Sequence, residues 1–568
     1  MHSAYEKEEY QRLQQHYRFN ESFQEWIIDK ANRLFILKRG VDEYIHEKLI
    51  PAAYQKAFEN GIPDHLKEEY PETRLTKRHF IIHAGPTNSG KTYQSIQSLL
   101  IAKKGIYLAP LRLLALEVFE KLNDNGVSCD LITGEKEIIV PFSTHLSSTV
   151  EKANFQEEYP VAVIDEAQLI SDKERGSAWF RAIIGIKAKE IHICCSLNAV
   201  KLIKRIVEDC NDKVEIHYHE RNTPLIVQKE EVSFPADIKK GDAIIAFSRK
   251  KVLRMAAHLR KNGFKPAIIY GALPPITRRK QVEFFNNGKA DVVVATDAIG
   301  MGINLPIQRI IFSELEKFDG TGIRKLTSQE IKQIAGRSGR RGIYNIGWVA
   351  SMTKKSSFIE NKLNQKDSII KKAVIEPLEE TILQIQYGNL INKLRYWNDF
   401  TYKLNYLEKA DISKQLDLLM ILPKKILESN KDKLLYHAVH IPFQKRNTIL
   451  TQQWQNYVFQ VCENNQRLEK PFEEIFEKHS LDVLEVKYKQ LDLYYSFSKV
   501  FQKQLDREWV TKHRQKVSNL IMQYLIGADL KIFISCRGCG ENRLYFEAGD
   551  YCEKCSMEHF KREEYWLL

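Results

Sequence analysis

The stretch HFIIHAGPTNSGKTYQSIQSLL, from His79 to Leu100, decides the fold of this chain. Its apolar start predicts a buried strand, and YQSIQSLL has the apolar spacing of a helix. Between them lies G-x4-G-K-T, in which glycines let backbone N–H groups surround a phosphate. We predict a P-loop that binds ATP, with Lys91 reaching the β and γ phosphates and Thr92 ligating Mg²⁺; the loop comprises Gly85, Pro86, Thr87, Asn88, Ser89, Gly90, Lys91 and Thr92.

Short apolar runs alternate with helical stretches from about residue 76 to residue 352. This alternation is typical of βαβ units in parallel sheets, and its length requires two sheets in succession. We therefore predict an α/β fold with five regions: an N-terminal helical region (1–75), two sheet domains (76–223 and 224–365), a helical accessory domain (366–530) and a small zinc-binding module (531–568). The runs are HFIIHA, GIYLAP, VAVIDE, EIHICC, DAIIAF, KPAIIY, DVVVAT, RIIFSE and IGWVAS.

Two carboxylates follow the strand VAVI about seventy residues after the P-loop. Beside a bound nucleotide, Asp165 would hold Mg²⁺ through water and Glu166 would polarise the attacking water. An Asp-Glu pair at a strand end can also be a solvated loop or a helix cap. The spacing from the P-loop favours the catalytic interpretation.

The stretch SQEIKQIAGRSGRRG places Gln333, Arg337 and Arg340 near one another. On the helix that we expect there, the two arginines lie on one face and can reach one phosphate together. They would stabilise charge on the γ-phosphoryl group if the second sheet faces the P-loop. The alternative is a generic basic patch.

Four cysteines near the C-terminus have the spacing C-x2-C, twelve residues, C-x2-C. Four thiolates at this spacing suit tetrahedral Zn²⁺, so we predict a zinc ribbon. Its net charge of −1 favours a clamp or a protein-docking role over phosphate binding. The other five cysteines are expected to be core thiols in a reducing compartment. The predicted zinc ligands are Cys536, Cys539, Cys552 and Cys555.

Charge is distributed unevenly along the 568 residues. The net charge is +13, and residues 224–365 hold 25 Lys and Arg against 12 Asp and Glu. A surplus confined to one domain favours a polyanion such as nucleic acid as partner, although a solvated basic face is the alternative. No apolar run approaches the length of about 18 residues that a membrane helix needs. Six acids among the first thirty residues argue against a secretory or transit peptide, so we expect a cytoplasmic protein.

The ordered motifs resemble those of superfamily 2 DExH-type helicases, and more narrowly the suppressor-of-var family of mitochondrial degradosome RNA helicases and their bacterial relatives. The resemblance covers about residues 76–350 and rests on GPTNSGKT, LAPLRLLA, LITGE, DEAQ, FSRK, YGALPP, VATDAIGMGINLP and QIAGRSGR.

The resemblance implies two RecA-like domains that use ATP to move 3′-to-5′ on a single strand, unwind RNA and sometimes DNA at a duplex junction, and often work with an exoribonuclease. It assigns ATP binding and hydrolysis to the P-loop, Asp165, Glu166, Gln333, Arg337 and Arg340. It assigns contacts with the nucleic-acid backbone to residues that follow predicted strands, namely Arg112, Thr133, Ser248 and Thr296.

One motif departs from the family pattern, because the usual Ser-Ala-Thr coupling motif is Cys195-Ser196-Leu197 here. A rival function is an ATP-gated clamp or ribonucleoprotein remodeller that separates no strands. A further alternative is a DNA helicase.

A β-hairpin is expected around Asp319-Gly320, a dipeptide favoured in tight turns. Phe318 would then stack on the last base pair of a duplex, with Arg324 and Lys325 holding the backbone. The alternative is that the hairpin extends the second sheet and Phe318 packs against it.

Overall fold

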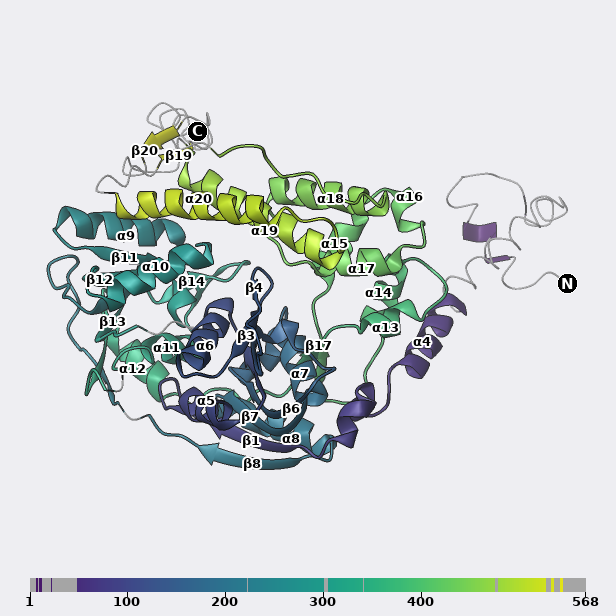
Figure 1. Cartoon of the computed structure of the whole chain (residues 1–568), viewed down its shortest axis with the longest axis horizontal. Coiled ribbons are helices and arrows are strands. Elements are labelled where there is room, and N and C mark those ends of the chain that lie inside the picture. Colours follow the sequence, from purple (N-terminus) through teal and green to yellow (C-terminus); the bar gives the residue numbers. More distant parts are fainter. Residues whose placement is uncertain are drawn as a thin grey trace. The chain divides into compact units, whose positions relative to one another are not determined.

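The computed structural model describes residues 7–8, 10–12, 22, 49–221, 223–300, 305–340, 342–475, 479–527, 533–535 and 542–544. The chain forms two compact units. The first comprises Met1–Asp64, Glu376–Leu404 and Ile412–Tyr436, and the second comprises His65–Ile375, Asn405–Asp411 and His437–Leu568. Figure 1 labels the elements of both units. Among the helices described, none combines the length and the hydrophobicity required to cross a membrane.

The first sheet of the second unit has eight strands in the order β4-β3-β5-β2-β6-β7-β1-β8. Every pair is parallel except β3 with β4. The central strands β2 and β6 are rich in apolar residues because both faces of the sheet are buried. The strands are β1 (His79–Ala84), β2 (Gly105–Ala109), β3 (Cys129–Ile132), β4 (Glu137–Ile138), β5 (His145–Thr149), β6 (Glu158–Ile164), β7 (Lys187–Cys195) and β8 (Lys213–Tyr218).

Four helices connect these strands, as a parallel sheet requires. They are α5 (Lys91–Ile101), α6 (Arg112–Asp124), α7 (Gly176–Gly185) and α8 (Val200–Asp209). Helix α5 begins at the last two residues of the P-loop motif, so the predicted strand-loop-helix arrangement is confirmed.

The second sheet has six strands, all parallel, in the order β11-β12-β10-β13-β16-β9. All nine predicted strands are present in the two sheets, which confirms the α/β class. The strands of this sheet are β9 (Leu225–Val227), β10 (Asp242–Ile245), β11 (Pro266–Ile269), β12 (Val292–Ala295), β13 (Arg309–Phe312) and β16 (Gly347–Ser351). Its helices are α9 (Arg249–Lys261), α10 (Pro275–Asn286), α11 (Ser328–Ala335) and α12 (Ser356–Asn364).

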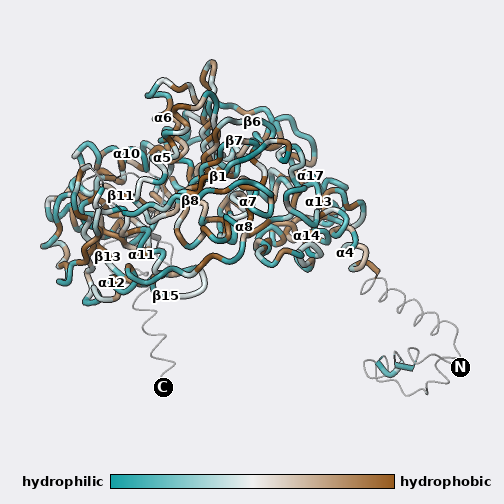
Figure 2. Tube along the Cα trace, turned by 90° about the horizontal axis from the view of Figure 1, so that it is seen from below, coloured by the Kyte–Doolittle hydropathy of each residue, from teal (hydrophilic) through white to brown (hydrophobic). Residues whose placement is uncertain are grey.

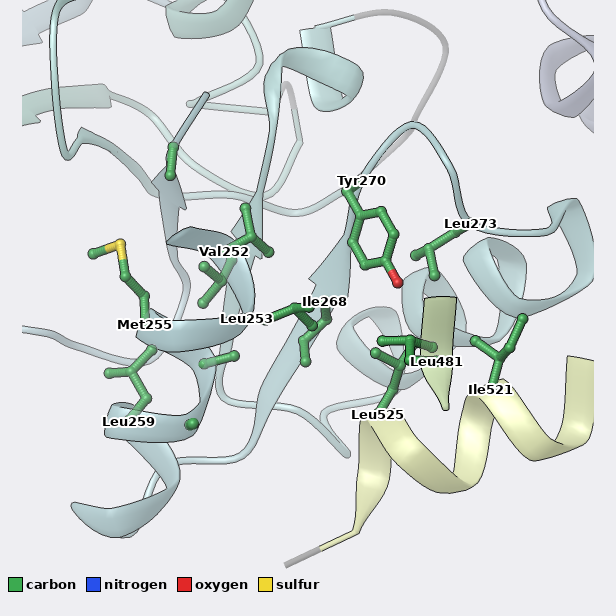
Figure 3. Close-up of a cluster of buried hydrophobic side chains, with 14 of the residues drawn as sticks. Val252, Leu253, Met255, Leu259, Ile268, Tyr270, Leu273, Leu481, Ile521 and Leu525 are labelled. Carbon is green, nitrogen blue, oxygen red and sulfur yellow. The ribbon is translucent and has the colours of Figure 1, made fainter. Parts of the chain in front are cut away.

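Two long helices complete the core of the second sheet domain. Helices α19 (Leu481–Val500) and α20 (Arg507–Ile526) contribute Leu481, Leu484, Ile521 and Leu525 to the same buried cluster as the side chains of α9 and β11 (Figure 3). The hydrophobic stretches of the tube lie largely inside the sheet domains, and hydrophilic stretches follow the outer loops (Figure 2). The second unit also contains α18 (Thr448–Cys462), β17 (Ala373–Ile375) and β18 (Leu407–Lys409).

The first unit is built around α4 (Ile50–Gly61), whose aromatic side chains are buried. The Tyr54 ring stacks on that of Tyr396, with ring centroids 4.2 Å apart, and Phe58 packs against Phe400. The bounds predicted for separate helical domains stay predictions. The other helices here are α13 (Glu379–Leu383), α14 (Leu390–Asp399), α15 (Ser413–Met420) and α16 (Lys424–Leu427), and α17 (Asp432–His440) begins in this unit.

Candidate active site

The P-loop turns sharply between β1 and α5. Asn88 and Gly90 have φ angles of 63° and 85°, in the left-handed region that glycine and asparagine tolerate best. A Cβ atom on Gly85 would lie 2.4 Å from the His219 carbonyl oxygen, so only glycine fits there. The Ser89 hydroxyl is buried, and none of the described residues forms a hydrogen bond with it. An anion seated in this loop would supply the missing hydrogen-bond acceptor.

Lys91 directs its ammonium across the mouth of the loop. Its Nζ donates to the carbonyl oxygens of Gly85 at 2.7 Å and Pro86 at 2.8 Å. These are neutral acceptors, so a phosphate oxygen would replace them at a net electrostatic gain.

Asp165 lies directly beside the P-loop threonine. Its carboxylate accepts from the Thr92 hydroxyl at 3.2 Å, the Tyr107 hydroxyl at 2.7 Å and the Glu166 N–H at 2.9 Å. Burial and the neighbouring Glu166 raise the pKa of Asp165 to about 6. A buried carboxylate beside a hydroxyl provides the hard oxygen ligands that Mg²⁺ prefers, so the residues present fit this ion.

Glu166 is tied to the strand that follows the acid pair. Its φ angle of 50° turns the chain out of β6, and its carboxylate accepts from the Gln168 amide. The Gln168 Oε1 atom in turn accepts from the Ser196 N–H at 3.1 Å. The acid pair is thereby connected to the Cys195-Ser196-Leu197 segment.

The predicted arginines lie in a loop rather than on a helix face. Helix α11 ends at Ala335, and Gly339 has a φ angle of 69°, so the expectation of one continuous helix is wrong. The Arg337 guanidinium donates to the Gly300 carbonyl oxygen through Nε at 3.0 Å and Nη2 at 2.8 Å. Burial lowers the pKa of Arg337, while the negative charges of Glu166 and Asp165 act against that shift.

This arginine loop contacts the P-loop directly. The Asn88 side-chain amide donates to the Gly339 carbonyl oxygen at 3.0 Å. A Cβ atom on Gly336 would lie 2.7 Å from the Thr87 Cβ, so glycine permits the close approach. Gln333 reaches the same region, with its side chain close to Gly300. The residues predicted on the two sheets are thus brought together.

Arg221, which the sequence analysis missed, bridges the two loops. Its Nη1 donates to the Thr87 carbonyl at 3.0 Å and the Gly336 carbonyl at 2.8 Å, and its Nη2 donates to the Ser338 carbonyl at 2.5 Å. Burial lowers the pKa of Arg221 to about 10, so it stays protonated at neutral pH. No motif marks this arginine, because its partners are backbone carbonyls distant in the sequence.

Glu117 on α6 is a second residue that the motifs did not indicate. Burial raises the pKa of Glu117 to about 7, against the positive charges of Arg337 and Arg340. A carboxylate of the first sheet domain therefore faces both arginines of the second.

The predicted nucleic-acid contacts follow β2, β3, β10 and β12, at the carboxyl ends of parallel strands. Arg112 forms an ion pair with Glu135, and the Thr133 hydroxyl donates to the Lys136 carbonyl at 3.1 Å. The Ser248 hydroxyl caps α9, and the Thr296 hydroxyl accepts from the Ala298 N–H at 3.3 Å. These side chains are occupied within the protein, and their contacts with nucleic acid stay predictions.

The predicted hairpin is confirmed. Strands β14 (Glu316–Phe318) and β15 (Ile323–Lys325) pair antiparallel, and the Asp319 carboxylate accepts from the N–H groups of Thr321 and Gly322. The Phe318 residue is 63% exposed, so it does not pack against the sheet. The hairpin forms a two-stranded sheet of its own and does not extend the second sheet.

The four cysteines predicted to bind zinc, Cys536, Cys539, Cys552 and Cys555, lie outside the described residues. Within the part of the chain that is described, no group of three or more His, Cys, Asp or Glu side chains could hold a metal ion. Cys129, Cys194, Cys195 and Cys210 are buried, as expected for core thiols, and Cys462 is half-buried.

Two family models match the sheet domains. Residues 66–219 match the DEXQ-box helicase domain of Suv3, and residues 227–342 match the helicase conserved C-terminal domain. Together with the P-loop and the arginine loop, these matches define the class as a two-domain helicase core. Within this core, the Suv3-type DEXQ-box match is carried by the first sheet domain.

Curated relatives support this assignment. The chain is 45% identical over 277 residues to the "ATP-dependent RNA helicase SUV3L, mitochondrial" of Oryza sativa, with 48% of this chain and 38% of the rice protein covered. It is 44% identical over 322 residues to the "ATP-dependent RNA helicase SUV3, mitochondrial" of Candida albicans, covering 55% and 44%. The chain thus spans less than half the length of these two relatives.

The expectation of a cytoplasmic protein is wrong. The related helicases from rice, Candida, yeast and mouse all carry the word mitochondrial in their names, which point to mitochondria instead. Among solved structures, the chain resembles the Escherichia coli DEAH/RHA helicase HrpB at 16% identity and a TM-score of 0.46, with 82% of this chain and 63% of that one covered.

Proposed function

We propose that this protein is an ATP-dependent RNA helicase that moves 3′-to-5′ on a single strand. One observation carries the proposal: the loop bearing Arg337 touches the P-loop through the 3.0 Å hydrogen bond from Asn88 to Gly339. Catalytic groups from both sheets therefore converge where the nucleotide would lie. The relatives' names support RNA as the substrate.

The side chains divide the work of hydrolysis among them. Lys91 binds the β and γ phosphates in place of its two loop carbonyls, and Glu166 orients the attacking water. Arg337 and Arg340 stabilise the charge that develops on the γ-phosphoryl group, and Gln333 helps to position this group. Mg²⁺, held by Thr92 and Asp165, would neutralise phosphate charge when bound.

The strand would run along the carboxyl ends of the two sheets, past Arg112, Thr133, Ser248 and Thr296. The basic surplus in residues 224–365 supports a phosphate-binding path there. The exposed Phe318 at the β14–β15 turn is suited to stack on the last base pair of the duplex junction. An exoribonuclease partner belongs to the same proposal and rests on the family resemblance alone.

The function is tested by pairing two assays on the full chain. Wild-type protein should show RNA-stimulated ATP hydrolysis and displace a strand from a duplex with a 3′ overhang. Lys91→Ala should abolish both activities, and Glu166→Gln should bind ATP but not cleave it. The exposed Lys103 provides the matched control, because Lys103→Ala should change neither.

Two results would contradict this function. ATP hydrolysis that is stimulated by RNA yet displaces no strand would identify an ATP-gated clamp or remodeller. Preferential unwinding of a DNA duplex would identify a DNA helicase.

We also propose that Cys536, Cys539, Cys552 and Cys555 bind one Zn²⁺ ion, on the strength of their spacing. Elemental analysis of purified protein should find about one zinc per chain, and Cys536→Ser with Cys539→Ser should lose it. Zinc content unchanged in that double variant would refute the site.

A further inference from the structure

Residues 365–370 follow α12 and attach to the helix that precedes the arginine loop. The Asp367 carboxylate accepts from the Ser328 hydroxyl at 2.7 Å and from the Lys332 ammonium at 3.1 Å. Lys332 also donates to the Gln365 carbonyl oxygen. Ser328 and Lys332 belong to α11, which ends two residues before Arg337.

The same segment attaches to the first sheet domain one residue further along. The Asn198 side-chain amide donates to the Ser368 carbonyl oxygen at 3.0 Å, and the Ile370 N–H donates to the Asn198 carbonyl oxygen at 3.0 Å. Asn198 is buried. Since neighbouring Cα atoms are about 3.8 Å apart, the two attachments at Asp367 and Ser368 have almost no slack between them.

Asn198 is connected in turn to the residue that orients the attacking water. Its Oδ1 accepts from the Ser196 hydroxyl at 2.5 Å, the Ser196 N–H donates to Gln168, and Gln168 donates to Glu166. An unbroken series of contacts therefore runs from Glu166 to Ser368. It passes through the segment in which the usual Ser-Ala-Thr motif is replaced.

We propose that residues 367–370 form a strap that couples Glu166 to the helix preceding Arg337, with Asn198 and Asp367 as positioning residues. The strap lets a change at the hydrolysis site of one sheet move the arginine loop of the other. This inference rests on the proposed function. The strap would provide the coupling between the two sheet domains, because the usual Ser-Ala-Thr motif is replaced by Cys195-Ser196-Leu197.

The test is a double-mutant cycle with Asn198→Ala and Asp367→Ala in the full chain. Each change should lower the kcat of RNA-stimulated ATP hydrolysis about fivefold or more while KM for ATP stays within about twofold. Combining them should lower kcat no further than the worse single change, because either one already cuts the strap. Lys366→Ala, an exposed position directly before the strap, should match wild type.

Hydrogen exchange measured without nucleotide or RNA decides the matter independently of activity. Asn198→Ala should speed amide exchange in residues 328–335, across the domain boundary, as well as around residue 198. Exchange altered only near residue 198, or kcat losses that multiply in the double variant, would overturn the strap. A wild-type protein without RNA-stimulated ATP hydrolysis would refute the proposed function, and the exchange result would still judge the strap.

Discussion

At the scale of single residues, Arg221 holds the P-loop and the arginine loop together. Arg221 donates to backbone carbonyls on both sides of the nucleotide site and to the carbonyl of Thr223, the last residue of the first predicted sheet domain. A planar guanidinium can satisfy these acceptors at once, whereas an ammonium cannot. The position of the arginine loop therefore depends on a side chain that lies outside every motif.

Arg221→Ala should lower the kcat of RNA-stimulated ATP hydrolysis about tenfold or more, because carbonyls from both domains lose their shared donor. Arg221→Lys should restore only part of the loss. Steady-state kinetics against ATP would measure both, and the exposed Lys229, changed to Ala, is the control. Wild-type turnover in Arg221→Ala would show that the loop is held by other contacts.

The motifs predicted the residues whose chemistry is tied to a fixed spacing. Lys91 and Thr92 follow the P-loop glycines, and Asp165 ends a strand, so each could be found in the linear sequence. Arg221 and Glu117 could not, because each interacts with residues of the second sheet domain that it meets only after folding. Contacts between residues that are distant in the chain produce no local sequence pattern.

At the scale of elements, three strands below the P-loop are joined by histidines. His83 on β1 bonds His192 on β7 at 2.9 Å and His219, just after β8, at 3.0 Å, and His192 bonds Glu190 at 2.7 Å. Each link holds one proton, so the series is satisfied when all three histidines are neutral. Burial and the neighbouring histidines lower the pKa of His83 to about 3.

The first sheet should therefore lose stability as the pH falls below about 6.5. In the unfolded chain, the His83 side chain binds a proton over this pH range, whereas in the folded protein it stays neutral. This difference lowers the free energy of unfolding by about 1 kcal/mol between pH 6.5 and 5.5. Thermal melting at pH 7.5 and 5.5 would show the loss. His83→Gln should lose less over this interval, and the exposed His258, changed to Gln, should behave as wild type. Equal losses in all three proteins would contradict the role of His83.

Two of the strands that the sequence did not indicate share a simple physical feature. β5 reads HLSST and β8 reads KVEIHY, so polar side chains interrupt the apolar run in each. Ser147 is nevertheless buried, because its hydroxyl donates to the Ala115 carbonyl of α6 at 2.6 Å. A tertiary hydrogen bond of this kind overrides the local pattern.

At the scale of the second unit, α19 and α20 are stabilised mainly by packing against the second sheet. Their apolar side chains share its core, and the Tyr270 hydroxyl donates to the buried Glu485 carboxylate at 2.6 Å. Their contacts with the first sheet domain include the Lys499–Glu137 ion pair at 2.5 Å and the Arg514 donation to the Glu135 carbonyl at 3.0 Å. The two helices should therefore move with the second sheet.

Leu484→Ala should destabilise the protein by about 3 kcal/mol, since it removes a fully buried side chain from this shared core. The neighbouring Val483 is 40% exposed, and Val483→Ala should change the unfolding free energy by less than about 0.5 kcal/mol. Denaturant unfolding would measure both. If Leu484→Ala lowered the unfolding free energy no more than Val483→Ala does, α19 would not contribute to the core of the sheet.

The shared core also determines the order in which the two sheet domains can fold during synthesis on the ribosome. The last strand of the second sheet ends at Ser351, yet side chains that cover one of its faces come from Leu481 through Leu525. While the intervening residues are being synthesised, α9 covers only part of that face, and exposed apolar surface of this kind attracts chaperones or aggregates. The first sheet takes its strands from residues 79–218 and can close long before, so the nascent chain carries its P-loop in place well ahead of the completed arginine-bearing half.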